Sequence, residues 1–412
     1  MKEVAIITGV RTPIGRYMGA LKSIEAYDLA SLVLNEAIKR ANLEPEMVDE
    51  VIMGQSYQNG EYVNIARMAL LKAGWPESMP GITIDRRCCT GLDVVRLASS
   101  LIQAGEAEVI VAGGVESMSN AEFYLPGSIK WGLGGKKGMP RGHGDLSIWG
   151  IPLYDRIQRA RVMSQPEERY GVLPSMMSWA ETAAREANIS REDCDQWALQ
   201  SHRKACAAME AGKFAEEVVP VLVPTPKGDP VVVDRDEGPR ADTSLDKLSK
   251  LKPVLGGVCT AGNSSSENDG AAVVVVTSAK KAAQLGMEPL AYVKAFSVVG
   301  DDPTRTYRTV PKATRSALEK AGLKLKQIDL IEIQEAFAAQ VLADLKGMGL
   351  GRADYERINV NGSGISLGHP IACTGTRVLV TLLHEMRRRD VRYGLETICG
   401  GGGLGIAAVF ER

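Results

Sequence analysis

The feature that most limits the fold is a repeat, in which two distant stretches follow the same order of helix, loop, aspartate and strand. The first, AIKRANLEPEMVDEVIMG, starts at Ala37, and the second, ALEKAGLKLKQIDLIEIQ, starts at Ala317. A spacing of this size exceeds that of solenoid repeats, so the pattern predicts two fused copies of one domain.

Short β-rich runs alternate with helical patterns in the chain. EVAIITGV, VDEVIMGQ and AEVIVAGG have the length of strands, and the helical patterns LASLVLNEAIKRANL and NIARMALLKAG separate them. Such alternation is typical of βαβ units on a largely parallel, buried sheet, so the predicted fold class is α/β. Two such halves facing each other would form a cleft at their interface, a usual place for a site.

We expect an N-terminal half over residues 1–274 and a C-terminal half over residues 275–412. The stretch from about 120 to 250 differs in character, because it contains GLGGKKGMPRGHGD and then an amphipathic helical pattern over 191–212. We interpret it as an inserted loop region, part ordered and part lid-like.

Composition excludes several classes of protein. With 45% hydrophobic residues and a net charge of -1, the 412-residue chain is typical of a globular protein without a nucleic-acid partner. Its longest apolar runs are far shorter than the roughly 20 residues that cross a bilayer, so we expect no membrane partner. Seven scattered cysteines and an opening without a secretory signal predict free thiols in the cytoplasm. None of the four histidines has metal-ligand spacing, so we expect no metal.

Two adjacent cysteines, Cys88 and Cys89, stand at the predicted start of a helix in IDRRCCTGLDVV. A thiol at a helix N-terminus faces free N–H groups, which lower its pKa and favour the reactive thiolate. The alternative is a small buried hydrophobic residue. For Cys89 we favour that packing role over a strained vicinal disulfide with Cys88.

Three further places are unusual for a scaffold. His369 stands between Gly and Pro in NVNGSGISLGHP, where a loop positions it rather than packs it. Cys399 ends an apolar strand and runs into four glycines, whose N–H groups can approach a ligand or form an oxyanion hole; the alternative is a tight turn between strands. Gln334 and Glu335 follow a buried strand and precede a helix.

Together these segments resemble the thiolase family, the acetyl-CoA acetyltransferases and 3-ketoacyl-CoA thiolases. The resemblance covers nearly the entire chain, through VRTPIGRYMGAL, DRRCCTGLDVV, AGNSSSENDGAA, QEAFAAQ, NVNGSGISLGHPIACTG and CGGGGLGIA in that order. It implies a duplicated βαβαβαββ fold with a five-layered αβαβα core and an inserted loop domain. It also implies an acyltransferase with coenzyme A as cosubstrate, acyl-CoA and CoA as partners, and no permanently bound cofactor.

The resemblance assigns roles to five residues. Cys88 is the nucleophile that carries the acyl group as a thioester, and His369 takes its proton. Cys399 is the acid and base at the α-carbon of acetyl-CoA. One oxyanion hole uses the N–H groups of Cys88 and Gly401, and the other uses His369 with a water. The family commonly has Asn where this chain has Gln334, the residue that would hold that water.

The resemblance also indicates where coenzyme A binds. Arg240 in DEGPR, and Ala261 and Ser265 in AGNSSS, match CoA-binding positions, and Met176 matches a residue of the pantetheine tunnel. A family serine is replaced by Lys247.

A further departure from the family lies beside the nucleophile. Asp85 replaces the usual Asn, and an acid near Cys88 raises the pKa of its thiol, which the arginines between them offset.

Two other functions stay open from the sequence alone. Condensing relatives such as hydroxymethylglutaryl-CoA synthase share the fold and nucleophile, but do not combine Gly-His-Pro with a terminal Cys-Gly-rich base. The second is a thiolase-like, non-catalytic subunit that binds CoA esters or lipids within a complex. We expect a homodimer or homotetramer, with Trp149, Met163 and Tyr170 of the insert available for contacts.

Overall fold

A computed structural model describes residues 2–127, 129 and 152–412. The predicted N-terminal half contains a sheet whose strands run in the order β4 (Gly81–Ile84), β3 (Glu50–Gly54), β5 (Val109–Ser117), β10 (Asn268–Ser278) and β1 (Val4–Arg11). β3 is parallel to β4 and β5, whereas β10 is antiparallel to β5 and β1. All eleven residues of β10 are buried, as expected for a strand covered on both faces.

The C-terminal half repeats this arrangement. Its strands run in the order β12 (Leu330–Ile333), β13 (Tyr393–Gly400), β14 (Leu404–Glu411) and β11 (Ala291–Gly300). β12 and β13 are parallel, and the other pairs are antiparallel. The two halves join where β1 and β11 pair over two residue pairs. In the repeat, the strand GITID of the first half corresponds to RINVN (357–361) of the second, which the sequence therefore predicts to be a strand. RINVN instead forms isolated bridges, one of them between Ile358 and Ile331.

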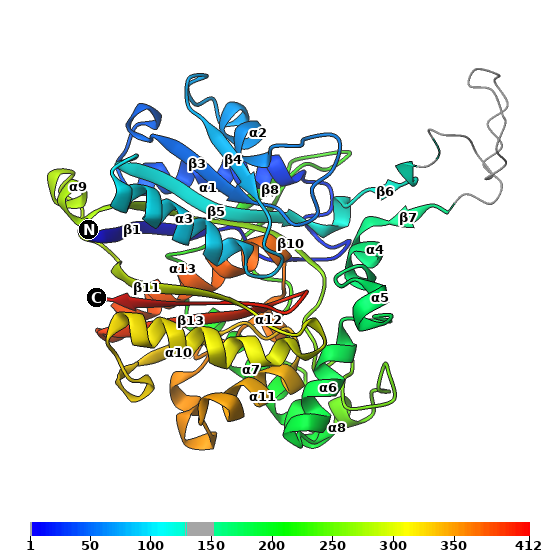
Figure 1. The fold of residues 1–412 in the computed structure, drawn as a ribbon. Coiled ribbons are helices and arrows are strands. Elements are labelled where there is room, and N and C mark those ends of the chain that lie inside the picture. Colours follow the sequence, from blue (N-terminus) through cyan, green and yellow to red (C-terminus); the bar gives the residue numbers. More distant parts are fainter. Residues whose placement is uncertain (1, 128, 130–151) are drawn as a thin grey trace, which may run out of the picture.

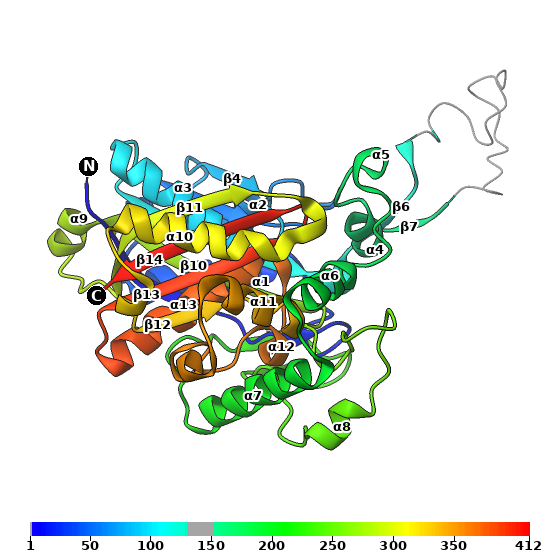
Figure 2. The ribbon, with the colours of Figure 1, turned by 60° about the horizontal axis from the view of Figure 1, so that its bottom comes forward.

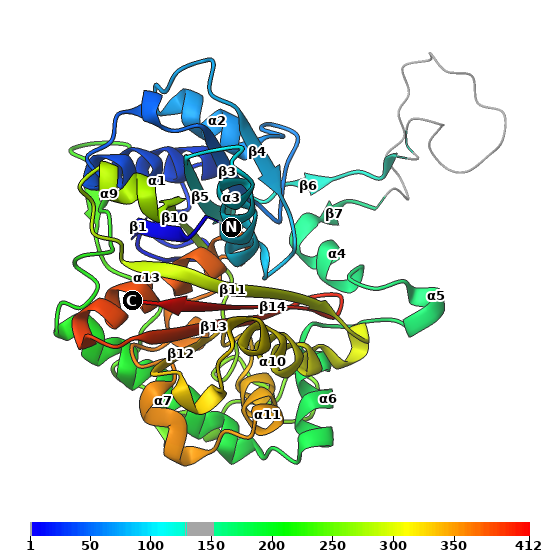
Figure 3. The same ribbon diagram turned by 60° about the vertical axis from the view of Figure 1, so that its left-hand side comes forward.

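Five layers result, as Figures 1 and 3 show. Helices α1 (Ala26–Arg40) and α2 (Ile65–Lys72) cover the outer face of the first sheet. Helices α3 (Thr90–Ala104) and α13 (Ile371–Arg389) lie between the two sheets and share one apolar core with both. Helices α10 (Thr309–Ala321) and α11 (Ala338–Met348) cover the outer face of the second sheet. The predicted αβαβα architecture is therefore confirmed.

The two central helices touch near their N-termini through glycines. A Cβ on Gly91 of α3 would lie 2.6 Å from the backbone nitrogen of Thr376, and one on Gly375 of α13 would lie 2.3 Å from that of Leu92. Real Cβ atoms do not approach so closely, so this contact needs two residues without side chains. It fixes the spacing of the turns that precede the helices.

The predicted insert contains most of the remaining elements. They are β6 (Phe123–Tyr124), β7 (Tyr154–Asp155), α4 (Arg156–Val162), α5 (Glu167–Tyr170), α6 (Met177–Ala187), α7 (Arg191–Glu210), β8 (Val221–Val223), β9 (Val231–Val233) and α8 (Leu245–Ser249). β6 and β7 pair as an arm that projects from the body, while α6 and α7 pack against α11 (Figure 2). Trp149 lies outside the described residues, and the division at residue 274 stays a prediction.

Other short elements of the described residues are β2 (Gly15–Arg16), α9 (Ala279–Gln284), α12 (Gly364–Leu367) and several 3-10 helices, such as Pro303–Arg308 and Arg352–Arg357. Within the described ranges, no helix has the length and apolar character needed to span a membrane.

Candidate active site

Cys88 lies in the tight turn between β4 and α3. Arg87, immediately before it, has a left-handed φ of 53°, and its N–H donates to the Asp85 carboxylate at 2.7 Å. This turn leaves Cys88 half-buried beside the C-terminal half. Cys89 is fully buried in the core between the sheets, with its thiol 3.6 Å from the carbonyl oxygen of Ile398. The two neighbouring thiols therefore occupy different environments, and both are free.

His369 reaches Cys88 from the loop before α13, with 3.2 Å between its Nε2 and the cysteine sulfur. Its Nδ1 lies 2.6 Å from the Thr374 hydroxyl oxygen, and that hydroxyl donates to the Pro370 carbonyl at 2.9 Å. Because the single hydroxyl proton is used there, Thr374 accepts from Nδ1–H. Nε2 is then the unprotonated nitrogen and faces the thiol as an acceptor. This is the geometry of a base beside its nucleophile.

The resting thiol is not the thiolate expected from the sequence. Burial raises the pKa of Cys88 to about 11, although the Gly401 N–H and the Arg87 charge oppose the shift and Asp85 adds to it. The prediction of a lowered pKa is wrong because α3 begins only at Thr90, and desolvation outweighs the donors that Cys88 receives.

The histidine is also neutral. Burial lowers the pKa of His369 to about 3, and the positive charges of Arg377 and Arg161 lower it further. A neutral imidazole and a neutral thiol therefore face each other, and the proton moves only when sulfur attacks a substrate.

Cys399 lies at the end of β13, near the same point. Gly401 begins the turn to β14, in which Gly402 and Gly403 have φ of 84° and 77°, so the tight turn considered from the sequence is present. The Gly401 N–H lies near the Cys88 sulfur and opposes the rise of its pKa. Burial, with nearby Asp344 and Cys88, raises the pKa of Cys399 well above its usual value. Cys88, His369, Cys399 and Gly401 thus meet in one place.

Gln334 lies beside the loop that carries His369. Its side chain is fully buried and its amide has no hydrogen-bond partner within the described part of the chain. A Cβ on Gly364 would lie 2.6 Å from the amide nitrogen, so the two segments are in close contact. A buried amide without a partner is suited to hold a water or a substrate oxygen.

Glu335 anchors this loop. Its carboxylate accepts hydrogen bonds from Trp197 Nε1 at 3.0 Å, from the Ser201 hydroxyl at 2.6 Å and from Asn359 Nδ2 at 2.9 Å. The two neighbouring residues therefore have different roles: Glu335 fixes the loop, and Gln334 presents its amide to the site.

The residues matched to coenzyme A fall in two places. Arg240, Ala261 and Lys247 line a cavity of about 500 Å³, and Ser265 stands between two other residues of that lining. The Lys247 ammonium forms an ion pair with Asp242 at 2.6 Å. This cavity has the size of a small-molecule site.

Met176 is not among the residues that line this cavity. Its methyl group would be 3.4 Å from a Cβ on Gly401, which places it at the cysteines instead.

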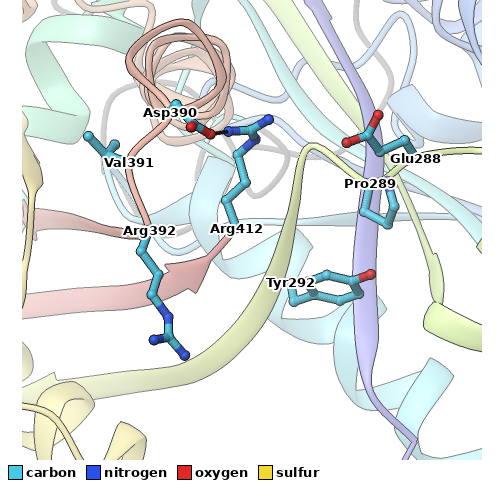
Figure 4. Close-up of a pocket in the computed structure, with 7 residues that line it drawn as sticks. All are labelled: Glu288, Pro289, Tyr292, Asp390, Val391, Arg392 and Arg412. Carbon is cyan, nitrogen blue, oxygen red and sulfur yellow. Dashed lines mark hydrogen bonds and ion pairs between the residues drawn. The ribbon is translucent and has the colours of Figure 1, made fainter.

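Figure 4 shows another cavity, of about 400 Å³, at the far ends of β13 and β14. Arg412 pairs there with Asp390 at 2.5 Å, and Arg392 pairs with Glu411 at 2.6 Å. Cys399 lies six residue steps along β13 from Tyr393, a distance of roughly 20 Å. Its arginines are already paired and it lies far from the thiols, so it is not the entrance to the site.

Comparison with known proteins agrees with this geometry. The family model described as "Thiolase, N-terminal domain" matches residues 4–280, and "Thiolase, C-terminal domain" matches residues 287–412. The chain belongs to the thiolase family. It is therefore an enzyme of that family, as the sequence motifs predicted.

Relatives of this thiolase cover its whole length. An acetyl-CoA acetyltransferase of Cupriavidus necator is 43% identical and one of Escherichia coli is 44% identical, each covering 100% of both chains. The Bacillus anthracis acetyl-CoA acetyltransferase structure matches with a TM-score of 0.90 at 40% identity, and human mitochondrial 3-ketoacyl-CoA thiolase with 0.88 at 36%. Both structures match 100% of this chain and 99% of their own.

Sequence reasoning missed several residues that support the site. Thr374 follows Pro370 by one helical turn, a spacing that could have indicated the hydroxyl beneath His369. Asn268 accepts the His369 backbone N–H at 2.8 Å, and the Glu116 carboxylate accepts that of Ala372 at 3.0 Å. Both come from distant strands, so no local pattern indicated their contact with this loop.

Proposed function

We propose that this thiolase cleaves 3-ketoacyl-CoA with free CoA, and catalyses the reverse Claisen condensation, through an acyl group on Cys88. The observation that carries the proposal is the 3.2 Å approach of the unprotonated Nε2 of His369 to the Cys88 sulfur. A cysteine can accept an acyl group as a thioester and release it to another thiol, which suits exchange between CoA esters.

Cleavage proceeds in two balanced steps. In the first, the Cys88 proton moves to His369 and sulfur attacks the 3-keto carbon. The bond between C2 and C3 then breaks, the acyl group stays on Cys88, and the departing enolate of acetyl-CoA takes a proton from Cys399. In the second step Cys399 takes the thiol proton of CoA, the CoA sulfur attacks the thioester carbon, and the bond from that carbon to the Cys88 sulfur breaks. Cys88 then takes back its proton from His369. The products are a shortened acyl-CoA and a free Cys88, and the cysteines regain their protons.

Two sets of donors would stabilise the negative oxygens. The N–H of Cys88, in the turn after β4, and that of Gly401, in the turn after β13, would stabilise the oxygen of the tetrahedral intermediate. A water held between His369 and the Gln334 amide would donate a hydrogen bond to the enolate oxygen. Donors fixed in a dry site stabilise such charges strongly, by about 3–4 kcal/mol for one donor in comparable sites.

The coenzyme would enter through the cavity lined by Arg240 and Ala261. Arg240 is exposed, and its guanidinium can pair with a phosphate of CoA. Ser265 stands between Ser264 and Ser266 of the cavity lining, and Met176 lies beside Gly401, near the cysteines. No permanent cofactor is needed, because CoA itself is the cosubstrate.

The acyl group would lie against an apolar cluster from both halves and the insert. Tyr57, Met118 and Ile157 are buried together, with Ala160 and Ile371 packed beside them. Ile371 is two residues from His369, and the Arg87 side chain contacts the Ala160 carbonyl, so α4 forms a wall near Cys88. We propose that this wall sets the acyl size, with a substrate bulkier than acetoacetyl-CoA.

Mass spectrometry tests the acyl-enzyme. Incubation with an acyl-CoA should add one acyl mass to the peptide that contains Cys88, and Cys88→Ser should abolish it. An acyl group found on Cys89 instead would contradict the assignment of Cys88 as the nucleophile.

A thiolysis assay tests the activity itself. Loss of the Mg-enolate absorbance of acetoacetyl-CoA, compared with longer and branched 3-ketoacyl-CoAs, also measures acyl size. A non-catalytic CoA-ester-binding subunit would bind without turnover, and the full-length acetyltransferase relatives do not favour it.

We further propose a cytoplasmic homodimer or homotetramer that works in fatty acid metabolism. β4 is an edge strand on which Ile82 is 46% exposed, and Met68 and Leu71 of the neighbouring helix α2 are exposed as well. An unpaired edge of this kind is a template for another strand. Met163 of the insert is also exposed, and Tyr170 is half-buried. Light scattering of the wild type and Ile82→Lys tests the assembly, and a wild-type monomer would refute it.

A further inference from the structure

An aspartate that the mechanism above does not use lies buried on α11. Asp344 has no exposed surface, and one of its carboxyl oxygens contacts the amide nitrogen of Gln340. The other carboxyl oxygen and the Gln340 amide oxygen have no partner within the described part of the chain. No ion pair of the described residues includes Asp344.

The helix that carries Asp344 covers the face of the sheet to which Cys399 belongs. Leu395 of β13 packs in one core with Val341 and Leu345 of α11, whereas Ile398 packs on the opposite face with α3. Side chains alternate along a strand, so Cys399 shares the face of Leu395. Figure 3 shows α10 and α11 together on that side of β13 and β14.

Charge on Asp344 would act directly on Cys399. Among the charged groups near Cys399, Asp344 is the one that raises the pKa of the thiol most, ahead of Cys88 and Cys89. Burial raises the pKa of Asp344 itself well above its usual value, and its bond with Gln340 lowers it only in part.

An ionised carboxylate cannot easily persist there. Burying an unpaired carboxylate is so costly that the group takes up a proton instead. A carboxylic acid O–H needs an acceptor, and the Gln340 amide supplies one when its oxygen and nitrogen are exchanged, an assignment that the hydrogen-bond network decides.

We propose that α11 holds Asp344 as a neutral carboxylic acid, so that Cys399 can become a thiolate, which makes Asp344 a positioning residue of the thiolase reaction. The inference rests on the proposed acid–base role of Cys399. No proton passes between the two residues, because Cys399 exchanges its proton with the substrate α-carbon. Two anions are unfavourable in one dry compartment, so ionisation of Asp344 at alkaline pH suppresses the Cys399 thiolate.

Residue-specific alkylation tests this proposal. In a Cys88→Ser background, the rate at which iodoacetamide modifies Cys399 is followed by peptide mass across pH, with and without Asp344→Asn. Asparagine keeps the size of the neutral acid and cannot ionise. We expect equal alkylation rates near neutral pH, where Asp344 carries no charge. At alkaline pH, where Asp344 ionises in the wild type, alkylation should be about tenfold faster in the variant, the equivalent of about one pH unit.

Asp329→Asn is the matched control. Asp329 is an exposed carboxylate that accepts the Tyr393 N–H at 2.8 Å, at the opposite end of β13. This variant loses the same charge and should leave the Cys399 profile unchanged. An unchanged profile in Asp344→Asn, or an equal shift in Asp329→Asn, would overturn the proposal.

A second variant covers the case in which Asp344→Asn does not fold. Thiolysis activity should fall at alkaline pH, where Asp344 ionises. Gln340→Leu removes the hydrogen bond that lowers the pKa of Asp344, so this fall in activity should move to higher pH. A fall at the same pH as in the wild type contradicts the proposal. If Cys399→Ala keeps full thiolysis, the proposed role of Cys399 fails, while the alkylation shift still reports on Asp344.

Discussion

Replacing Thr374 by Val should impair acyl transfer through the tautomer of His369. The Thr374 hydroxyl accepts Nδ1–H at 2.6 Å and donates to the Pro370 carbonyl, which leaves Nε2 free for the thiol proton. Valine keeps the volume and removes both bonds. The buried Nδ1–H then has no acceptor, and the other tautomer places a proton on Nε2, where Cys88 must deliver its own.

The size of the effect follows from the lost acceptor. Leaving one buried donor unsatisfied costs about 1–3 kcal/mol. If this cost falls on the acylation step, the rate drops about 5- to 150-fold. Stopped-flow measurement of acylation by a 3-ketoacyl-CoA gives the rate directly, and urea unfolding gives the loss of stability.

Thr381→Val is the matched control, since Thr381 is buried on the same helix two turns further along. Its hydroxyl donates to the Glu217 carboxylate at 3.0 Å and does not contact the histidine. We expect a loss of stability of about 1 kcal/mol with acylation nearly unchanged. Equal rate losses in both variants, or full acylation in Thr374→Val, would refute the argument from the tautomer.

Three further predictions concern the same cleft. The pKa of Cys88, raised to about 11, means that the thiolate fraction is small at neutral pH, so its alkylation by iodoacetamide should accelerate with pH beyond pH 9; a plateau below pH 7 would contradict this. Gly401→Ala places a Cβ 3.3 Å from Trp179 and should lower kcat about tenfold, as measured by thiolysis; wild-type kcat would show that the turn adjusts freely. Arg240→Ala should raise the KM for CoA about tenfold with kcat kept, whereas Lys250→Ala, outside the cavity lining, should change neither; equal effects would place CoA elsewhere.

The fold could be predicted because the repeat and the strand patterns are local properties of the chain. Strand β10 consists largely of valine and alanine, and α3 ends at Gly105, whose left-handed φ of 83° favours glycine, so neither needs distant contacts to be recognised. The short strand expected at RINVN failed for the opposite reason. Whether RINVN pairs as a strand depends on its fit to the edge of β12, which the five residues themselves do not determine.

The motifs identified the residues of the site, but they did not predict the pKa values of these residues. A helix start after Cys88 suggested a thiolate, while the closure of the C-terminal half over the sulfur, which raises its pKa, involves residues some 280 positions away. Asp344 was missed because a lone aspartate in a helical pattern normally faces solvent. Its burial depends on the packing of α11 against the second sheet.

The contact between Gly91 and Gly375 restricts how the two copies of the repeat can diverge without loss of the reaction at Cys88. Cys88 belongs to one copy of the repeat and His369 to the other, and the glycine contact lies just behind both. Any side chain gained at either glycine would separate sulfur from imidazole before it disturbed the outer layers. Each copy can therefore vary freely on its outer face, whereas a shift of its central helix succeeds only if the other copy shifts with it.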